Sequence, residues 1–419
     1  MADFRFLHCA DLHLDSPLRG LQADPDAPAD AIRGATRRAF ANLVDYALTE
    51  GIDFVVAAGD LYDGDWQDWR TGRFLIDQVR RLTQADIPFV AIRGNHDAEN
   101  VMTRRLELRG DSARLLDHRK PETFYLPGRS VAIHGRSFPA RAVTENIALT
   151  YPAPDPECFN IGLLHTSIDG REGHDNYAPC SVEQLRDHGY DYWALGHVHQ
   201  REILSRDPWI VFPGNLQGRH INEPGEKGAS LVTVTGGKVS DVRHVTFDAV
   251  QWTRISIAIA VDADEDAALA QVRSALAAAY EKADGRLLAA RVLVSGACVA
   301  HEAFSRDLGS AREKIRAEAL NVAEHGAIWM EAVEIATTAP AGGTIPRDRA
   351  DAIGQLIRAL EAVTEDEVIP EIQQYAATML DKAAPLRLAL GEGHAAANEV
   401  FTRELVRRAR DLLLGSILE

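Results

Sequence analysis

The sequence has few cysteines and no long apolar run. Its four cysteines, Cys9, Cys158, Cys180 and Cys298, are far apart and form no C-x-x-C pair. This spacing excludes a zinc ribbon and a disulfide framework, and it is typical of a protein from a reducing cytoplasm. No stretch reaches the roughly 18 consecutive apolar residues of a membrane span, and the first residues lack the features of an export signal. We therefore expect a cytoplasmic protein that is neither exported nor membrane-spanning.

Positive charge is also scarce. The 45 Lys and Arg residues face 62 Asp and Glu residues, which leaves a formal net charge of -17. Because nucleic-acid binding draws much of its affinity from Lys and Arg at phosphates, this balance argues against a general nucleic-acid binder. Part of the negative charge can instead serve bound cations. The length of 419 residues and the 46% hydrophobic content predict a globular protein of two or three domains.

Five predicted strands end in polar residues. The apolar runs lie within residues 4–10, 53–60, 87–97, 159–167 and 191–199. Catalytic and ligand groups gather beyond strand ends, because the sheet fixes the backbone while the loop lets side chains converge. The residues at these ends are Asp11, His13, Asp60, Asn95, His96, His165, His197 and His199. We expect them to meet at one site.

The chemistry of this set predicts metal binding. Carboxylate oxygen, imidazole nitrogen and amide oxygen without thiolate suit Mn, Fe, Zn or Co, whereas a dedicated Mg or Ca site would favour oxygen throughout. Seven ligands drawn from these eight residues are already more than one ion with open positions needs. Two ions sharing a bridging carboxylate, roughly 3.5 to 4 Å apart, would use them all.

The spacing of the ligands suggests how the backbone presents them. Residues i and i+2 of an extended chain point to the same side, so Asp11 with His13, and His197 with His199, are each expected to face one cavity. A glycine precedes three of the ligand segments, where we expect sharp turns at positive φ. These glycines are Gly59, Gly94 and Gly196.

Predicted secondary structure divides the chain into three regions. Residues 1–248 hold the strands with polar ends, with predicted helices at 29–50 and 66–86 and a β-rich part from 202. Residues 249–338 predict a compact β-α-β-α-β domain, with helices at 265–283 and 309–325. The linker "APAGGT" then precedes residues 345–419, whose apolar spacing predicts helices that pack on the core or dock a partner.

The order of the motifs resembles a known family. D-x-H, G-D, G-N-H-D, H and G-H-x-H follow one another within residues 5–228, as in the calcineurin-like metallophosphoesterase superfamily. More narrowly, "HCADLHLDSP" (8–17) and "FPGNLQGRHINEPGEKG" (212–228) resemble the bacterial SbcD/YhaO-type DNA repair exonucleases. The resemblance implies an α/β fold: a four-layer αββα-sandwich core with a small α/β capping domain and C-terminal helices. It also implies a homodimer that works with an SMC-like coiled-coil ATPase, docked by the C-terminal helices.

The resemblance further implies the roles of the site residues. One ion would be held by Asp11, His13, Asp60 and His199, and the second by Asp60, Asn95, His165 and His197. Mn is the favoured ion, with Fe, Zn, Co or Mg as alternatives. Such cations lower the pKa of a shared water, so that hydroxide is available near neutral pH. His96 would not bind metal; it would stabilise or protonate the leaving oxygen, as an imidazole near its own pKa can.

Two aspartates near these motifs have two interpretations each. Asp63 matches the position from which a carboxylate orients the catalytic His in phosphatases of this superfamily, so we predict an Asp63–His96 dyad; alternatively, Asp63 caps the following turn. Asp97 either supports the site through hydrogen bonds or acts as a helix N-cap.

Local features for DNA binding are also ambiguous. The segment 101–120 carries Arg104, Arg105, Arg109, Arg114, Arg119 and Lys120. It predicts either a basic patch beside the site or a solvated face of mixed charge. Trp66 and Trp69 either stack on a base or pack in the core.

The leading hypothesis is a metal-dependent DNA phosphodiesterase, a 3′–5′ exonuclease with possible endonuclease activity, in DNA repair. The first alternative is a phosphoesterase acting on small nucleotides or cyclic nucleotides, because one metal centre serves both and a fold does not choose a substrate. A second alternative is a non-catalytic DNA-end-binding or scaffold subunit.

Overall fold

The structure is a computed structural model that describes residues 3–16, 27–63, 69–99, 108, 112–168 and 177–340, with scattered positions after 353. It divides into two compact units. The first comprises Met1–Arg254, Ala279–Arg291 and Ala323–Glu331, and the second comprises Ile255–Ala278, Val292–Val322 and Ala332–Glu419. Among the described residues, no helix has the length and apolar character needed to cross a membrane.

The first unit contains two six-stranded sheets. In one, the order is β12-β11-β1-β2-β3-β4, formed by Lys238–Thr246, Gly228–Thr235, Phe4–Cys9, Phe54–Ala58, Phe89–Ile92 and Ala113–Leu115. Strands β1 to β4 run parallel, whereas β11 and β12 join as antiparallel strands. In the other, the order is β5-β6-β7-β8-β10-β9, formed by Glu122–Tyr125, Val131–Gly135, Phe159–His165, Tyr192–Gly196, Trp209–Phe212 and Glu202–Arg206.

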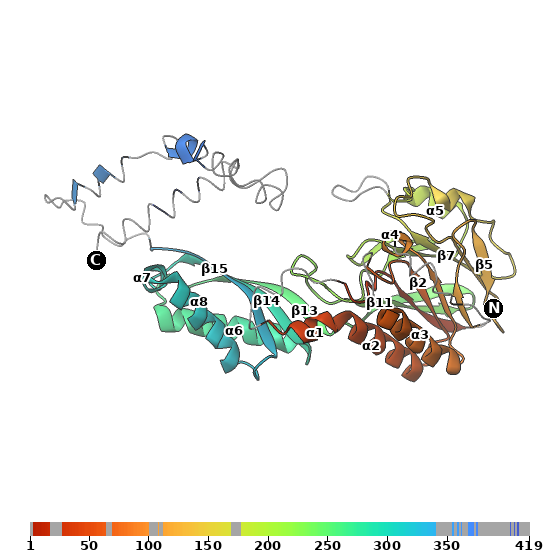
Figure 1. The fold of residues 1–419 in the computed structure, drawn as a ribbon, viewed down its shortest axis with the longest axis horizontal. Coiled ribbons are helices and arrows are strands. Elements are labelled where there is room, and N and C mark those ends of the chain that lie inside the picture. Colours follow the sequence, from red (N-terminus) through yellow and green to blue (C-terminus); the bar gives the residue numbers. More distant parts are fainter. Residues whose placement is uncertain are drawn as a thin grey trace. The chain divides into compact units, whose positions relative to one another are not determined.

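Helices cover the outer face of each sheet. Helices α2 (Ala35–Thr49) and α3 (Trp69–Gln84) lie on one side of the sheets and α5 (Val182–Asp187) on the other (Figure 1). The short helices α1 (Ala29–Arg33) and α4 (Asn95–Glu99) and a 3-10 turn at Ile147–Thr150 complete this part.

Three apolar clusters separate the layers. Phe6 and Val56 of the first sheet pack with Ile161 of the second between the two sheets. In the second cluster, Leu43 packs with residues of the first sheet that face the helices, and the third cluster holds α5 against the second sheet. Both faces of the central strands are buried, which explains their nearly continuous apolar sequences. The predicted four-layer αββα order is confirmed.

The predicted helix at 29–50 is interrupted. Gly34 separates α1 from α2, and α2 ends at Thr49, two residues before Gly51, whose φ is 64°. Within α2, Ala39, Leu43 and Ala47 recur every four residues and are fully buried. This spacing places them on the stripe that faces the sheet.

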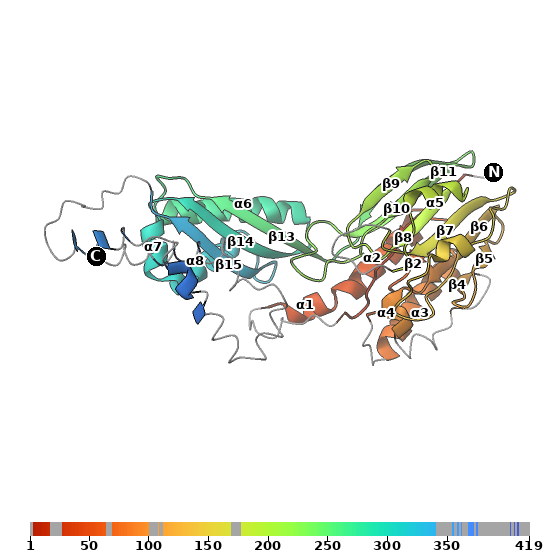
Figure 2. The ribbon, with the colours of Figure 1, turned by 90° about the horizontal axis from the view of Figure 1, so that it is seen from above.

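A third sheet has three strands, in the order β13-β14-β15. The strands are Val250–Ala258, Leu287–Ala297 and Ile328–Thr338; the helices between them are α6 (Glu265–Ala283), α7 (His301–Arg306) and α8 (Leu308–Ala317), followed by a 3-10 turn at Glu318–Asn321. Helix α6 runs alongside this sheet (Figure 2). The order differs from the predicted β-α-β-α-β in one respect, since α7 is an additional helix between β14 and β15, and α8 ends earlier than the predicted helix at 309–325. The helical segment predicted at 345–419 lies outside the described residues, apart from scattered positions.

Candidate metal centre

The polar strand ends of both sheets meet at one place. Asp11 follows β1, Asp60 follows β2, and Asn95 and His96 begin α4 after β3. From the second sheet, His165 is the last residue of β7. His197 and His199 follow β8. All seven predicted ligands are buried or half-buried, and Asp11, His13, Asp60 and His165 are at most 1% exposed.

The first predicted ligand group is brought together. Asp11, His13 and His199 each place one ligand atom within 4.8 Å of the others. The Nε2 atoms of His13 and His199 face each other at 3.1 Å. The His197 backbone N–H donates to both carboxylate oxygens of Asp11, at 3.1 and 3.0 Å, and so holds that side chain in place.

The second group lies beside the first. Asp60, His165 and His197 also have ligand atoms within 4.8 Å of one another. The Nε2 atom of His165 lies 2.9 Å from Asn95 Oδ1 and 3.4 Å from Asp60 Oδ2. Asn95 therefore joins this group, as its place in the predicted set requires.

Asp60 lies between the two groups. Its Oδ2 atom is 3.9 Å from His13 Nε2 and 3.4 Å from His165 Nε2, while its Oδ1 accepts from the His96 backbone N–H at 3.0 Å. One carboxylate oxygen thus faces both groups, which is the arrangement that a bridging ligand needs.

The protonation of the imidazoles fits metal binding. The Nδ1 atom of His165 lies 2.9 Å from the carbonyl of Ala58, and that of His199 lies 2.7 Å from Glu223 Oε1. Carbonyl and carboxylate oxygens only accept, so Nδ1 carries the proton and Nε2 offers its lone pair to the centre. The buried Nδ1 of His13 makes no hydrogen bond within the described part of the chain. This donor set fits two divalent cations.

The electrostatics of the site also favour a cation. Burial raises the pKa of Asp11 to about 6, and the nearby charge of Asp60 adds to the rise. Burial likewise opposes the ionisation of Asp60, yet the charge of His165 and its hydrogen bond outweigh it and lower the pKa of Asp60. Conversely, despite burial, Asp60 raises the pKa of His165 to about 9. A cation bound here would take over the charge compensation that protons otherwise supply.

The predicted dyad is formed. Asp63 Oδ1 lies 2.8 Å from His96 Nδ1, and Ser16 donates a hydrogen bond to Asp63 Oδ2. Burial lowers the pKa of His96, but the hydrogen bond to Asp63 and the charges of Asp60 and Asp63 together outweigh this, so that the net shift is upward. The His96 side chain is 32% exposed and therefore accessible to a substrate. The alternative role of Asp63, capping the next turn, concerns residues 64–68, which lie outside the described part.

Comparison with known proteins identifies the domain. The family model described as calcineurin-like phosphoesterase matches residues 4–201. This chain contains a calcineurin-like phosphoesterase domain. A second family model, metallophosphoesterase YhaO, middle domain, matches residues 252–338. The resemblance inferred from the motifs is confirmed, and calcineurin-like phosphoesterases bind a dinuclear divalent metal site.

The matches with individual sequence relatives cover only part of each relative's length. The chain is 38% identical over 261 residues to the uncharacterized metallophosphoesterase YhaO of Bacillus subtilis, covering 61% of this chain and 64% of that protein. It is 26% identical over 260 residues to the DNA double-strand break repair protein Mre11 of Sulfurisphaera tokodaii, covering 59% and 64%. Among solved structures, a dimetal phosphatase from Danio rerio matches 58% of this chain and 99% of its own, with 13% identity and a TM-score of 0.35. The chain thus spans less than two thirds of these two sequence relatives.

The backbone of the phosphoesterase domain presents its ligands differently from our expectation. Asp11, His13, Asp60 and His197 have φ values of 51°, 41°, 52° and 101°. These are left-handed conformations that residues with side chains rarely adopt and that gather at functional sites. The extended i and i+2 geometry was therefore the wrong reason for the convergence of each pair.

The three glycines also have different roles. Gly59 has the expected positive φ, 96°. Gly94 and Gly196 instead permit close approach, because an added Cβ would lie 2.2 Å from Asp60 Oδ1 and 2.0 Å from Ala58 O respectively. At these two positions the prediction of positive φ was wrong.

Asp97 takes the first of its two predicted roles, support of the site through hydrogen bonds. Its carboxylate accepts from the backbone N–H groups of Leu61, Tyr62 and Gly94, at 3.0, 2.9 and 3.0 Å. Gly94 directly precedes α4, while Leu61 and Tyr62 follow Asp60. Asp97 is the third residue of α4, so the prediction of a helix N-cap was wrong; its carboxylate instead ties the start of α4 to the loop that carries Asp60. Burial, with the charge of Asp60, raises the pKa of Asp97 to about 7.

Sequence reasoning missed two charged residues beside the site, Arg219 and Glu223. Besides contacting His199, Glu223 accepts from Asn215 Nδ2 at 2.9 Å, and it pairs with Arg219 at 3.0 Å. Arg219 also lies 3.5 Å from Asp63 and thus links the dyad to the metal centre. Both residues lie in the segment 212–228, and their opposite charges four residues apart were the available signal.

The predicted DNA-binding features are only partly covered. Arg104, Arg105, Arg109 and Trp66 lie outside the described residues. Arg114 hydrogen-bonds to Glu122 through Nε at 2.7 Å, so its charge is engaged within the domain. Trp69 begins α3 and is 56% exposed, which argues against packing in the core.

Proposed function

We propose that this chain is a dinuclear-metal-dependent DNA phosphodiesterase, acting as a 3′–5′ exonuclease with possible endonuclease activity in DNA repair. The observation that carries the proposal is the position of Asp60 between two groups of buried ligands, with the Asp63–His96 pair beside them. This arrangement supplies what a two-metal phosphoester hydrolysis requires: paired ligand sets and a proton donor.

Each group of residues has a distinct task in this reaction. Asp11, His13 and His199 would hold one cation, Asn95, His165 and His197 the other, and Asp60 both. When bound, such cations activate a water as nucleophile and offset charge on the phosphoryl oxygens. His96 protonates the leaving oxygen from Nε2, because its Nδ1 is directed towards Asp63. Asp63 and Ser16 fix the orientation of that imidazole.

DNA is the proposed substrate because two lines of support agree. The segments 8–17 and 212–228 resemble DNA repair exonucleases, and relatives from several archaea are named DNA double-strand break repair protein Mre11. The ion we propose is Mn, because the mixed nitrogen and oxygen ligands suit it better than Mg.

Partners complete the proposal. We propose that the chain forms a homodimer and acts in the cytoplasm with an SMC-like coiled-coil ATPase, docked through residues 345–419. Because the chain carries a net charge of -17, such a partner would supply most of the DNA affinity. The purified chain alone should accordingly bind DNA weakly.

A phosphoesterase acting on small nucleotides or cyclic nucleotides is the second candidate. It is favoured by the contact between Asp63 and His96, since this carboxylate matches the phosphatase pattern, and by the acidic net charge.

A nuclease assay separates the two candidates. End-labelled single- and double-stranded DNA would be incubated with the full chain and Mn²⁺, comparing wild type with His96→Ala and with His325→Ala, an exposed histidine outside the site. Degradation of DNA by wild type and His325→Ala, but not by His96→Ala, supports the nuclease. Hydrolysis of small nucleotide diesters with DNA left intact supports the second candidate. Fewer than about two bound ions per chain would favour a non-catalytic subunit.

A further inference from the structure

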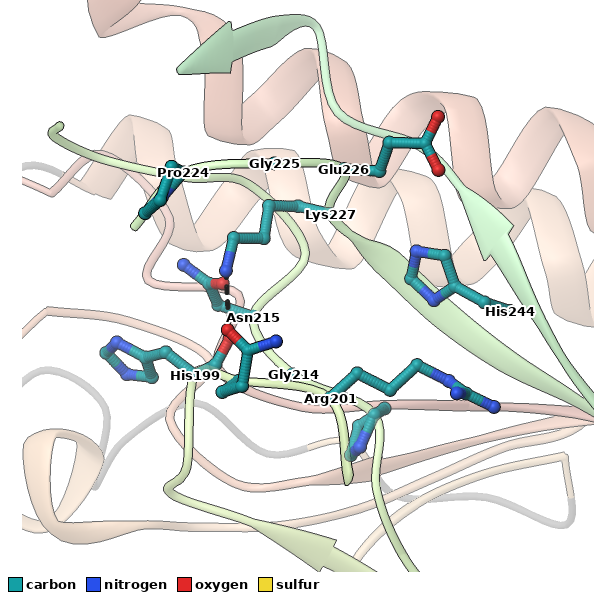
Figure 3. Close-up of a pocket in the computed structure, with 11 residues that line it drawn as sticks. His199, Arg201, Gly214, Asn215, Pro224, Gly225, Glu226, Lys227 and His244 are labelled. Carbon is teal, nitrogen blue, oxygen red and sulfur yellow. Dashed lines mark hydrogen bonds between the residues drawn. The ribbon is translucent and has the colours of Figure 1, made fainter. Parts of the chain in front are cut away.

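A pocket of about 360 Å³ lies directly beside the metal centre. Its wall includes His199, whose ring belongs to the first ligand group, and the next residues of the same loop. The other walls come from the loop before β11, with Lys227, and from His244 of β12 (Figure 3). A volume of this size is in the range of small-molecule and nucleotide sites, roughly 300 to 1,000 Å³.

Two basic side chains line the pocket, although the protein as a whole is acidic. Arg201 and Lys227 both line it, and Lys227 is only 5% exposed. Lys227 Nζ donates to the backbone carbonyl of His199 at 3.1 Å, as the dashed line in Figure 3 marks. The carboxylate of Glu226, also at the pocket, lies 3.6 Å from Arg286 and is thus partly engaged elsewhere. The local charge is therefore more positive than the net charge of the chain suggests.

Several polar atoms of the pocket lack a partner. Within the described part of the chain, no hydrogen bond is made by Arg201 Nε, by Asn215 Oδ1 or by either ring nitrogen of His244, although all are buried. Burying a polar atom without a hydrogen bond is costly because the atom loses its bonds to water, so native proteins rarely leave several such atoms together without a use. Burial lowers the pKa of His244; the charges of Arg201 and Lys227 act in the same direction and the charge of Glu226 acts against them.

We propose that this pocket is a second phosphate-binding subsite, which holds a phosphate next to the one being cleaved in a polynucleotide strand. Arginine offers a planar set of donors that matches phosphate oxygens, and lysine adds charge. The pocket is placed to act together with the metal centre because both use His199. Its ring belongs to the first ligand group, and its backbone carbonyl accepts a hydrogen bond from Lys227 in the pocket. The inference rests on the proposed function and specifies how the enzyme would select a chain of phosphates over a single phosphodiester.

Two variants and a matched control test the subsite. Arg201→Gln removes one charge, and His244→Gln changes a side chain whose ring nitrogens make no hydrogen bond within the described part of the chain. Arg243→Gln is the control, because Arg243 precedes His244 on β12, is exposed, and lies on the opposite face of the strand. Lys227 is left unchanged, since it also supports the His199 backbone.

The first measurement compares two substrates under the same Mn²⁺ conditions. We would measure kcat/KM for a ten-residue oligothymidylate and for bis(p-nitrophenyl) phosphate, which has one phosphate only. In Arg201→Gln and His244→Gln the ratio of the two values should fall about tenfold, mainly through KM, as expected for one charge-assisted hydrogen bond. Arg243→Gln should keep the wild-type ratio. An equal loss on both substrates, or no loss, overturns the subsite.

A binding measurement separates this inference from the proposed function. With metal removed by EDTA, the oligothymidylate should bind about tenfold more weakly to the two variants, and Arg201→Gln should make the salt dependence shallower by about 0.7 in log–log slope. If wild type binds the oligonucleotide in this way but never cleaves it, the function fails while the subsite stands. Equal binding by wild type and variants overturns the subsite. Inorganic phosphate that binds wild type as tightly as the oligonucleotide also overturns it, because the pocket would then serve the free ion.

Discussion

Asp63 Oδ1 lies 2.8 Å from His96 Nδ1, and Ser16 and Arg219 contact the other carboxylate oxygen of Asp63. The carboxylate is thus held from two sides and fixes the plane of an imidazole whose far nitrogen is accessible. Ser16 belongs to the "LDSP" segment, which gives that part of the sequence a direct link to the dyad.

Replacing Asp63 tests its positioning role. Asp63→Asn keeps the size of the side chain but weakens the contact that orients His96, so kcat should fall about 10²-fold, the lower range for loss of general acid catalysis. Metal content should stay at the wild-type value. Steady-state kinetics on a phosphodiester and metal analysis of the same samples provide the measurement. Asp284→Asn, at an exposed turn, is the control; an unchanged kcat in Asp63→Asn would show that the contact is not used.

Glu223 should control metal affinity through His199. The Glu223 carboxylate lies 2.7 Å from His199 Nδ1 and also accepts from Asn215 and Arg219. In Glu223→Gln, the amide NH₂ group would replace one of these accepting oxygens and would face a donor with which it cannot form a hydrogen bond. We expect Glu223→Gln to weaken one of two Mn²⁺ sites about 10- to 100-fold, as is common for residues that support metal ligands. Titration of free Mn²⁺ by electron paramagnetic resonance measures this. Glu183→Gln, exposed on α5, should bind as wild type does, and equal affinities in all three proteins would contradict the prediction.

Gly94 should be intolerant of any side chain. The Cβ of Gly94→Ala would lie 2.2 Å from Asp60 Oδ1 and must displace the carboxylate that faces both ligand groups. We expect a loss of about 1 to 3 kcal/mol in the free energy of unfolding, together with reduced metal binding. Urea unfolding and metal analysis test both. In Gly34→Ala the nearest atoms are at 3.3 and 3.4 Å, so this control should stay within about 0.5 kcal/mol of wild type.

His8 should make the fold sensitive to mild acid. It is fully buried on β1, with its ring nitrogens 3.0 Å from Tyr192 Oη and 3.1 Å from the Leu195 carbonyl, and burial lowers its pKa to about 3. The unfolded chain takes up a proton at His8 below pH about 6.5, whereas the folded protein does not, so stability is full above that pH and falls as pH drops towards 3.

The size of this effect can be isolated by a variant. Between pH 7.5 and pH 5, His8 should account for about 2 kcal/mol of lost stability. We would measure the free energy of unfolding by urea in EDTA at both pH values. The loss of this free energy from pH 7.5 to pH 5 should be smaller in His8→Gln than in wild type by this amount. The same pH difference in both proteins would mean that His8 is protonated in the folded state.

Sequence-based predictions and the structure agree best for the polar residues that directly follow apolar strands. Asp11, Asp60, Asn95, His165 and His199 were predictable because buried apolar strands tolerate such residues only at their ends, where a sheet gathers them. Asp63 was predictable through its resemblance to a family pattern. The helix at 29–50 was placed correctly, but its interruption at Gly34 was not, because apolar periodicity continues across the break.

By itself, the sequence predicted the phosphoesterase domain and the αββα order through the resemblance of its motifs to a family, and the seven candidate ligands through residue type at strand ends. Only the tertiary structure decided which oxygen of Asp60 faces both ligand groups, that Gly94 and Gly196 serve close approach, and that Glu223 supports His199 from 24 positions away. It also placed Arg201, Lys227 and His244 around one pocket. Such relationships depend on how distant loops pack against one another, and local sequence patterns carry no information about distances between segments that meet only in the folded chain.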